Sequence, residues 1–340
     1  MPTLTPQVRV ALLGFGNVAR AFVRYLQSAV ASSALRIKIT AIADSSGGIF
    51  LDNRSHLELM TSHKEAGGSL LEFAPSDLIR DAREFIQEFP RAGVSLLVES
   101  LPTNIASGEP ALSLISSALH QGTNVVTVDK GPLAHGFEAL MEAARTGGAR
   151  IGYCGATGVS IPDEIAGEPV LEIRGVLNGT TNYILTEMQQ HQQSFEEALA
   201  AAQAEGIAEP DPSLDIQGWD TASKILILAK SLMGADARLA DISRIGIGPQ
   251  TESLIRIARE SGRVLRLVGR ARIWQGRVRL SVAPKLVEPD SPFYSVSGTS
   301  KAAVFRTQRL GAVMAHARSG RDAISQTIME DIARINLRTS

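Results

Sequence analysis

Four carboxylates and a lysine lie close together along one stretch of the chain. They are Glu209, Asp211, Asp215, Asp220 and Lys224, and the apolar run Ile225–Ala229 follows them directly. Carboxylates can bind an ammonium group, and a lysine can donate a proton to an oxygen on which negative charge develops. The stretch therefore predicts a polar site at the edge of a hydrophobic core.

Asp220 and Lys224 are four residues apart, so on a helix they share one face. The same stripe continues through Ile227 and Leu228, which are typical core residues. We therefore expect an ion pair at the edge of a core. The alternative is a solvated surface pair, which would contribute only about 0.3–0.5 kcal/mol.

The spacing of the acids makes a structural demand on this stretch. At about 100° per residue, one unbroken helix from Pro212 would place Asp215 roughly 140° around the axis from Asp220. The two acids can meet only if the helix breaks near Gly218, and glycine permits such a break. In the alternative interpretation, Asp211 and Pro212 are simply a helix cap and its first turn.

The composition is that of an ordinary globular protein. The chain has 340 residues, of which 44% are hydrophobic and 20% charged, so two domains with real cores are expected. A net charge of −1 gives no electrostatic case for nucleic acid or a membrane surface as a partner. A single cysteine, Cys154, excludes an internal disulfide. With no signal-peptide pattern at the start, we expect a cytoplasmic protein.

The N-terminal segment predicts a dinucleotide site. An apolar strand at 8–13 runs into a GxGxxA turn, and residues 20–26 have helical periodicity. In such a unit the glycines allow a tight turn and close approach of a pyrophosphate to the helix N-terminus. The alternative is a tight turn in another α/β domain. The predicted cofactor-binding residues are Gly14, Phe15, Gly16, Asn17 and Val18.

Asp44 ends the next expected strand, residues 36–43. A carboxylate there accepts hydrogen bonds from the adenosine ribose, which favours NAD over NADP. Arg54 lies downstream and could instead reach a 2′-phosphate, and Asp44 could be only a turn residue. We therefore expect NAD or NADP, with NAD preferred.

Two further strands are expected at 94–99 and 124–128, with a helix at 110–120 between them. Ser100 and Lys130 follow these strands, and ligands of open parallel sheets bind outside the strands' carboxyl ends. Both residues are therefore predicted to lie at the cofactor crevice, with Lys130 held in a stiff turn by Gly131 and Pro132. The alternative for Lys130 is an ordinary surface turn.

After the small-residue loop 155–162 the pattern changes to that of a second domain. A strand at 171–177 is followed by Asn178–Asn182 and a helix at 183–188, which Thr180 or Thr181 could cap. Alternating strands at 264–269 and 277–282 predict antiparallel pairing. The predicted fold is α/β, with an N-terminal Rossmann-type parallel sheet and a second α+β domain that has a mixed or antiparallel sheet. The predicted domains are 1–152 completed by 311–340, for the dinucleotide, and 153–310, for substrate and dimerisation.

The spacing of residues 202–224 resembles the signature of homoserine dehydrogenases. The signature reads Ala-x3-Gly-hydrophobic-Ala-x2-Asp-Pro-x2-Asp-hydrophobic-x-Gly-x-Asp-x3-Lys. It is matched by Ala202, Gly206, Ile207, Ala208, Asp211, Pro212, Asp215, Ile216, Gly218, Asp220 and Lys224. The resemblance extends to the glycine turn and to segments 127–130, 178–182, 296–300 and 320–323, so it covers most of the chain. It corresponds to the short monofunctional form without an ACT domain.

The resemblance implies reversible, NAD(P)-dependent reduction of L-aspartate 4-semialdehyde to L-homoserine, a step of threonine and methionine biosynthesis. It also implies a homodimer. Lys224, Lys130 and Asp220 are the implied catalytic residues, with Asp220 orienting Lys224. Glu209, Asp215, Gly179 and Thr180 are the implied substrate-binding residues. The alternatives are another amino-acid or small-aldehyde dehydrogenase, such as aspartate dehydrogenase, and a non-catalytic NAD-binding regulator.

Three residues depart from the family pattern. Asp129 replaces a common asparagine before Lys130, and Ile207 replaces an aromatic residue that often precedes the conserved acid. Many members also carry a Glu-Ala segment that helps to hold a monovalent cation. The corresponding residues here, Tyr153, Cys154 and Gly155, lack that acid. A Na⁺ or K⁺ ion would then rest on backbone carbonyls of Cys154–Val159.

Overall fold

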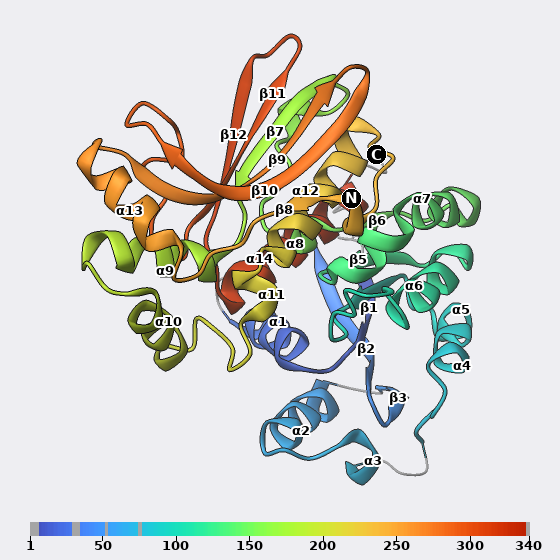
Figure 1. The fold of residues 1–340 in the computed structure, drawn as a ribbon. Coiled ribbons are helices and arrows are strands. Elements are labelled where there is room, and N and C mark those ends of the chain that lie inside the picture. Colours follow the sequence, from blue (N-terminus) through green and yellow to red (C-terminus); the bar gives the residue numbers. More distant parts are fainter. Residues whose placement is uncertain (1–6, 29–34, 52–53, 74–76, 338–340) are drawn as a thin grey trace. The chain divides into compact units, whose positions relative to one another are not determined.

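The computed structural model describes residues 7–28, 35–51, 54–73 and 77–337 (Figure 1). The chain forms two compact units. The first comprises Met1–Ala156 and Gly320–Ser340, and the second comprises Thr157–Ser319. In the described part of the chain, no helix is both long enough and apolar enough to cross a membrane.

The first unit is built on a six-stranded sheet of order β3-β2-β1-β4-β5-β6. All neighbouring strands pair in parallel except β2 and β3. The strands are β1 (Gln7–Leu13), β2 (Arg36–Asp44), β3 (Gly47–Phe50), β4 (Leu96–Glu99), β5 (Asn124–Thr127) and β6 (Ile151–Gly152). The carboxyl ends of the parallel strands share one edge, which is where an open sheet of this type binds its ligand.

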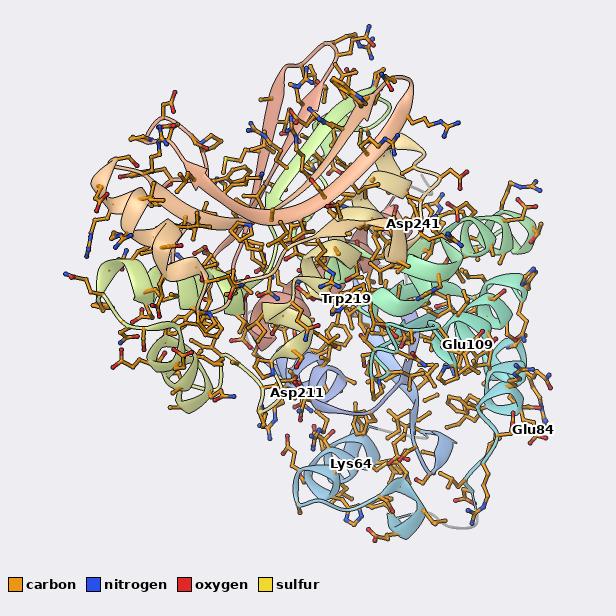
Figure 2. The ribbon with its side chains drawn as sticks, viewed as in Figure 1. Lys64, Glu84, Glu109, Asp211, Trp219 and Asp241 are labelled. Carbon is orange, nitrogen blue, oxygen red and sulfur yellow. The ribbon has the colours of Figure 1, made fainter. Side chains whose placement is uncertain are left out.

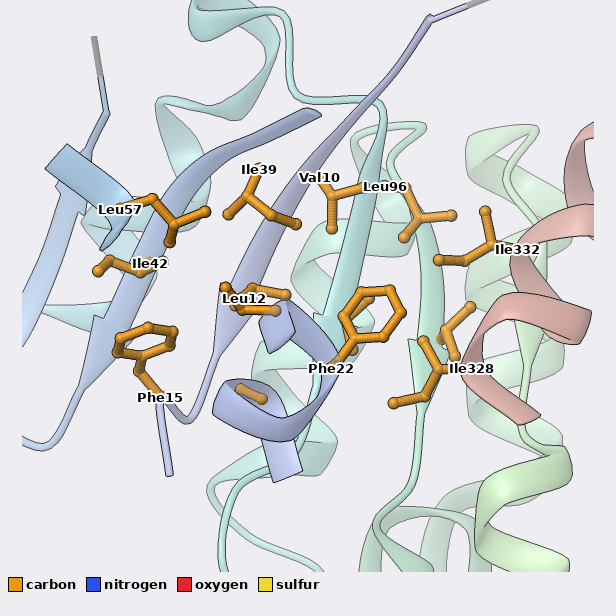
Figure 3. Close-up of a cluster of buried hydrophobic side chains, with 14 of the residues drawn as sticks. Val10, Leu12, Phe15, Phe22, Ile39, Ile42, Leu57, Leu96, Ile328 and Ile332 are labelled. Atoms are coloured by element: carbon orange, nitrogen blue, oxygen red, sulfur yellow. The ribbon is translucent and has the colours of Figure 1, made fainter. Parts of the chain in front are cut away.

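The helices of the first unit come after its strands along the chain, and the C-terminal helix is added to them. They are α1 (Asn17–Gln27), α2 (Arg54–Glu65), α3 (Leu70–Phe73), α4 (Ala82–Gln87), α5 (Phe89–Ala92), α6 (Ala111–His120), α7 (Lys130–Gly147) and α14 (Arg321–Leu337). Figure 3 shows Phe22 of α1 and Ile328 and Ile332 of α14 packed beside the strand residues Leu12 and Leu96. All five side chains are fully buried, so the C-terminal helix is part of this unit's core.

The second unit contains a mixed sheet of order β12-β11-β7-β9-β10-β8. β8 runs parallel to β10, and the remaining pairs are antiparallel. The strands are β7 (Val170–Val176), β8 (Ser243–Arg244), β9 (Val264–Trp274), β10 (Arg277–Val287), β11 (Lys301–Thr307) and β12 (Ala312–Ala317). The predicted fold class, a parallel Rossmann-type sheet followed by a mixed-sheet domain, is confirmed.

The helices of the second unit include those that carry the predicted site. They are α9 (Gly179–Gln190), α10 (Phe195–Ala204), α11 (Ser213–Ile216), α12 (Trp219–Met233) and α13 (Thr251–Glu260), with 3-10 turns η2 (Asp163–Ile165) and η3 (Leu239–Asp241). The short helix α8 (Cys154–Thr157) spans the boundary in sequence. α12 packs against β7, β9 and β10 because Ile225–Ala229 is completely buried.

The compact units have slightly different bounds from the predicted domains. The chain passes between units after Ala156 and again after Ser319. β12 pairs with β11 and therefore belongs to the second sheet, although residues 311–340 were expected to complete the first domain. The division at 1–152 with 311–340 and at 153–310 stays a prediction about functional domains.

Candidate functional site

The helix break demanded by the acid spacing occurs at Gly218. α11 ends at Ile216, Gly218 has φ 80°, and α12 begins at Trp219 (Figure 2). A left-handed φ is costly for residues other than glycine, and a Cβ there would lie 3.2 Å from a Val282 methyl. The prediction that residues 211–220 do not form one straight helix is therefore confirmed.

The break allows Asp215 and Asp220 to meet around Asn178. The Asn178 amide nitrogen donates to Asp215 Oδ1 at 2.6 Å and to Asp220 Oδ2 at 2.8 Å. Lys224 Nζ donates to Asp220 Oδ2 at 2.6 Å and to the Leu177 carbonyl at 2.9 Å. We call Asn178, Asp215, Asp220 and Lys224 the acid–lysine cluster.

The ion pair of this cluster is not a surface pair. The side chains of Lys224 and Asp220 are 11% and 10% exposed, so the solvated-pair alternative is wrong. Burial and the nearby Asp220 carboxylate raise the pKa of Asp215, while Asn178 and Lys224 lower it. Two carboxylates beside one ammonium leave an excess of negative charge, which a cationic ligand group would relieve.

The orientation of Asn178 is fixed by the helix that it caps. Its Oδ1 accepts a hydrogen bond of 2.8 Å from the Thr181 N–H at the start of α9. The amide oxygen therefore faces the helix and its NH₂ group faces the two acids. The expectation that Thr180 or Thr181 caps this helix is wrong, because α9 begins earlier, at Gly179.

Gly179 and Thr180 lie in the first turn of α9, directly after Asn178. A Cβ at Gly179 would lie 2.2 Å from Ser319 Oγ, so the close packing leaves room only for glycine. Thr180 Oγ1 donates to the Ile207 carbonyl at 3.1 Å, which joins α9 to the segment before the acids. The first N–H groups of a helix have no acceptor within the helix and suit an anion such as a carboxylate.

Glu209 is not one of the hydrogen-bonded residues that define the acid–lysine cluster. The residue is exposed, and its main-chain carbonyl accepts a hydrogen bond of 3.3 Å from Gln203. Asp211 is exposed too, and its carboxylate accepts from the Ser213 N–H at 3.1 Å, next to Pro212, which precedes α11. Of the four acids, the fold thus gathers Asp215 and Asp220.

In the first unit, the glycine turn has the predicted form. Gly14 has φ 90°, and a Cβ there would lie 2.7 Å from the Ser100 main chain. Gly16 is exposed, and a Cβ there would meet no atom closer than 4.0 Å, so the space beside it is open to a ligand. Ser100 Oγ donates to the Gly14 carbonyl at 3.0 Å, which ties the two strand ends together.

Some main-chain N–H groups of this turn donate to a neighbouring strand, and others have no acceptor within α1. The N–H groups of Gly14 and Phe15 both donate to the Ala43 carbonyl, and the Phe15 ring is buried in the core. The N–H groups of Asn17 and Val18 open α1 and have no acceptor within it. They are better placed than Phe15 to bind a pyrophosphate, so these residues fit a dinucleotide.

Arg20 was not among the predicted residues. Its guanidinium donates to Asn17 Oδ1 at 2.8 Å and to the Gly16 carbonyl at 3.2 Å, which places a positive charge at the start of α1. Its position three residues after Asn17 on a helix could have indicated this. Asn178 was also missed as the centre of the acid–lysine cluster, although asparagine before a helix is a common cap.

Lys130 begins a helix and does not lie in a stiff turn. It is the first residue of α7, and Asp129 caps that helix by accepting from the Gly131 N–H at 2.9 Å. The turn was predicted wrongly because Pro132 is compatible with the first turn of a helix as well as with a loop. Lys130 still follows β5 at the carboxyl edge of the sheet.

Asp44 is held by four donors of the chain itself. Ser46 N–H and Oγ donate to Oδ1, and Lys64 Nζ at 2.8 Å and the Leu70 N–H at 3.2 Å donate to Oδ2. Burial raises the pKa of Asp44, but these bonds outweigh burial and hold the pKa below its ordinary value. The Arg54 side chain lies outside the described residues.

The segment Cys154–Val159 does not fit a monovalent cation well. The Val159 carbonyl accepts a hydrogen bond of 2.7 Å from Thr157 Oγ1, and Arg334 places a guanidinium nitrogen 3.1 Å from Cys154 Sγ. A positive side chain beside Cys154 opposes a second cation there. Across the described residues, no group of three or more His, Cys, Asp or Glu side chains could hold a metal ion.

Comparison with known proteins covers both units. The family model described as "Homoserine dehydrogenase" matches residues 160–333, and the model for the NAD binding domain of the same family matches residues 14–153. The homoserine dehydrogenase of Methanocaldococcus jannaschii is 33% identical, over 96% of this chain and 98% of that protein. An NAD(+)-dependent homoserine dehydrogenase of Pseudomonas canavaninivorans is 31% identical, over 97% and 96%.

Solved structures agree with these matches. A crystal structure from Archaeoglobus fulgidus has a TM-score of 0.82 at 29% identity, and the match covers 96% of this chain and 99% of that one. A hyperthermophilic archaeal homoserine dehydrogenase in complex with NADPH has a TM-score of 0.78 at 26% identity, with 98% and 99% covered. The chain belongs to the homoserine dehydrogenase family.

Proposed function

We propose that the acid–lysine cluster is the catalytic and substrate-binding centre for reversible reduction of L-aspartate 4-semialdehyde to L-homoserine. The observation that carries the proposal is the buried Asp220–Lys224 pair, which Asn178 joins to Asp215. The cluster combines a proton donor with an excess of negative charge. Reduction of an aldehyde requires a proton for its oxygen, and a substrate that also carries an ammonium group requires negative charge to bind it.

Lys224 is proposed to protonate the reacting oxygen. When bound, the nicotinamide supplies or accepts the hydride at the carbonyl carbon. The oxygen that gains charge is then stabilised by an ammonium, which can also give it a proton. Lys224 has three donors, of which Asp220 and the Leu177 carbonyl take two, so one remains for the substrate. Asp220 keeps the lysine charged and oriented.

Asp215 and Glu209 are proposed to bind the substrate's α-ammonium. Asp215 is partly buried next to Asp220, so an incoming cation would remove an unfavourable charge balance. Glu209 is exposed and would have to turn toward the substrate. The N–H groups of Gly179 and Thr180 at the start of α9 would bind the α-carboxylate.

Lys130 and the glycine turn are proposed to serve the cofactor. The Asn17 and Val18 N–H groups and the Arg20 guanidinium would hold the pyrophosphate, and Gly14, Phe15 and Gly16 shape the turn. Ser100 and Lys130 follow β4 and β5 at the same edge of the sheet. We assign Lys130 to the nicotinamide end and to the substrate carbonyl.

NAD is proposed to be the preferred cofactor, in a chain that binds NAD(P). Asp44 directly follows Ala43, whose carbonyl anchors the glycine turn, and the lowered pKa of Asp44 keeps its carboxylate ionised. An ionised acid there repels a 2′-phosphate and can accept from the ribose hydroxyls. Since Asp44 already has four donors, a ribose hydroxyl would replace the Lys64 ammonium.

A homodimer and a cytoplasmic location complete the proposal. The family resemblance implies dimerisation through the second unit, where β12 is an edge strand with main-chain groups available for pairing. Cys154 is the single cysteine of the sequence and is buried, so it forms no internal disulfide, which fits a reducing compartment. Light scattering tests the dimer: twice the chain mass supports it, and a single chain mass overturns it.

Initial-rate oxidation of L-homoserine with NAD and with NADP in parallel tests the proposed function. We expect turnover with both cofactors and a higher kcat/KM with NAD. L-aspartate in place of L-homoserine is the matched control, and turnover of L-aspartate alone would favour an aspartate dehydrogenase. Tight dinucleotide binding without any turnover would favour a regulator.

A further inference from the structure

A second pair of buried acids lies in the first unit, at the carboxyl edge of its sheet. Glu99 ends β4, and Thr127, its partner across the sheet, ends β5. Asp129 follows two residues later and caps α7. Glu99 is 0% and Asp129 2% exposed, so neither carboxyl group is solvated. We call these two residues the Glu99–Asp129 pair.

The hydrogen bonds of the pair come from neutral groups. Glu99 accepts from Thr127 Oγ1 at 2.5 Å and from the Leu101 N–H at 2.7 Å. Thr127 Oγ1 in turn accepts from the Asp129 N–H at 3.0 Å, so this hydroxyl connects the two acids. Asp129 Oδ1 accepts from the Gly131 N–H, while Asp129 Oδ2 is buried and has no hydrogen-bond partner.

Two negative charges at this position would be very unfavourable, because buried charges are costly and like charges repel. Burial and then the charge of Asp129 raise the pKa of Glu99 to about 8. Below that pH Glu99 keeps its proton. Above it, Glu99 releases the proton and gains a negative charge close to Asp129.

The pair is connected to both cofactor-binding segments of this unit. Glu99 holds the Leu101 N–H, and the main chain of Ser100 and Leu101 packs directly against Gly14 of the glycine turn. Asp129 holds the start of α7, whose first residue is Lys130. Asp129 is also the charged group at the start of α7 that acts on Glu99.

We propose that the Glu99–Asp129 pair is a one-proton switch, in which Glu99 is a positioning residue and its proton sets the pH dependence of dinucleotide binding. With the proton in place, the strand end and the helix start are held together. Loss of the proton adds a charge that repels Asp129 and the anionic pyrophosphate. The raised pKa of Glu99 also lowers the free energy of unfolding as the pH rises from the ordinary range of a glutamate toward about 8, because the unfolded chain releases this proton first.

The switch can be tested by titrating the protein with NADH and following the NADH fluorescence. The titration is repeated at pH values from about 6.5 to about 9.5, which span the pH at which linkage predicts a change in Kd. For the unchanged protein we expect the Kd to rise about tenfold, equivalent to about 1.4 kcal/mol, with a midpoint near pH 8. Glu99→Gln removes the group that titrates, so its Kd should be nearly constant over this range. Asp129→Asn removes the like charge but not the burial, which is the larger cause of the raised pKa, so its rise in Kd should begin at a lower pH than that of the unchanged protein.

The exposed Glu84 of α4 provides the matched control (Figure 2). Glu84→Gln should keep the pH dependence of the unchanged protein. The proposal is overturned if the unchanged protein shows no rise in Kd, if the rise persists in a folded Glu99→Gln variant, or if the rise begins at the same pH in a folded Asp129→Asn variant as in the unchanged protein. It is also overturned if the variants weaken binding equally at every pH while the midpoint stays, which is the result for a purely structural role. Either variant suffices if the other does not fold.

Discussion

The acid–lysine cluster and the Glu99–Asp129 pair compensate buried carboxylates in different ways. In the cluster, Lys224 and the Asn178 amide donate to the acids, so the carboxylates can remain charged. In the pair, a hydroxyl and main-chain N–H groups are the donors, so one acid keeps its proton. Permanent charge suits a group that binds an ammonium and orients a lysine. A retained proton suits a group that responds to pH.

Removing the Asn178 side chain should leave the two acids of the acid–lysine cluster with fewer donors, as in the Glu99–Asp129 pair. In Asn178→Ala the two carboxylates lose their shared donor, which raises the pKa of Asp215 further. We expect kcat/KM for L-homoserine to fall about 10²-fold, because the acids no longer hold the substrate and Lys224 in one arrangement. Loss of the α9 cap should also lower the free energy of unfolding by about 1 kcal/mol.

Thr181→Val is the control for this variant, because Thr181 Oγ1 donates to the Asn178 carbonyl at 3.3 Å and to Asn178 Oδ1 at 3.0 Å and so contributes to the same helix cap. It should lower stability modestly and leave kcat/KM within about threefold, the scatter usual for a single lost hydrogen bond. Equal losses of kcat/KM in the two variants would contradict the role assigned to Asn178.

Asp44 provides a third acid site for the comparison, and its lysine, Lys64, comes from α2. In Lys64→Met the ribose hydroxyl no longer competes with an ammonium, and a 2′-phosphate loses a nearby cation. We expect the ratio of kcat/KM for NAD to that for NADP to rise about tenfold, or about 1.4 kcal/mol. Arg24→Met, which removes the ion pair with the neighbouring Glu65 of α2, should leave the ratio unchanged. An unchanged ratio in Lys64→Met would show that Asp44 does not read the ribose.

Gly218 tests the helix break that brings Asp215 and Asp220 of the acid–lysine cluster together. Gly218→Ala places a side chain at φ 80° and 3.2 Å from Val282, so the free energy of unfolding should fall by about 1–2 kcal/mol. Gly206→Ala is the matched control, since Gly206 has φ 69° and nothing within 4 Å of the added Cβ. Urea denaturation should show a larger loss for Gly218. An equal loss would mean that packing against Val282 does not matter.

The sequence predicted the parts of the cluster that depend on local geometry. The spacing of Asp220 and Lys224 placed both on one helix face, and the angle between Asp215 and Asp220 required a break at Gly218. Asn178 could not be found in this way, because it lies 37 residues from Asp215 and meets it through the packing of α9 against α11. Long-range partners of this kind depend on tertiary structure.

The first unit shows the same limit. The strand, glycine turn and helix around Gly14 were predicted because a local pattern specifies them. The Glu99–Asp129 pair was not, because it depends on the pairing of β4 with β5 and on the burial of both strand ends. Lys130 was expected in a turn, since Gly131 and Pro132 are as compatible with a loop as with the first turn of α7.

The central claim is that Lys224 acts on the reacting oxygen, and one variant tests it most directly. Lys230→Ala, in the last turn of the same helix, is the control and should keep normal turnover. For Lys224→Ala the account predicts that kcat for L-homoserine oxidation falls about 10³-fold, within the usual range for loss of an acid or base catalyst. NADH should still bind with an unchanged Kd. Undiminished turnover by Lys224→Ala would contradict the account.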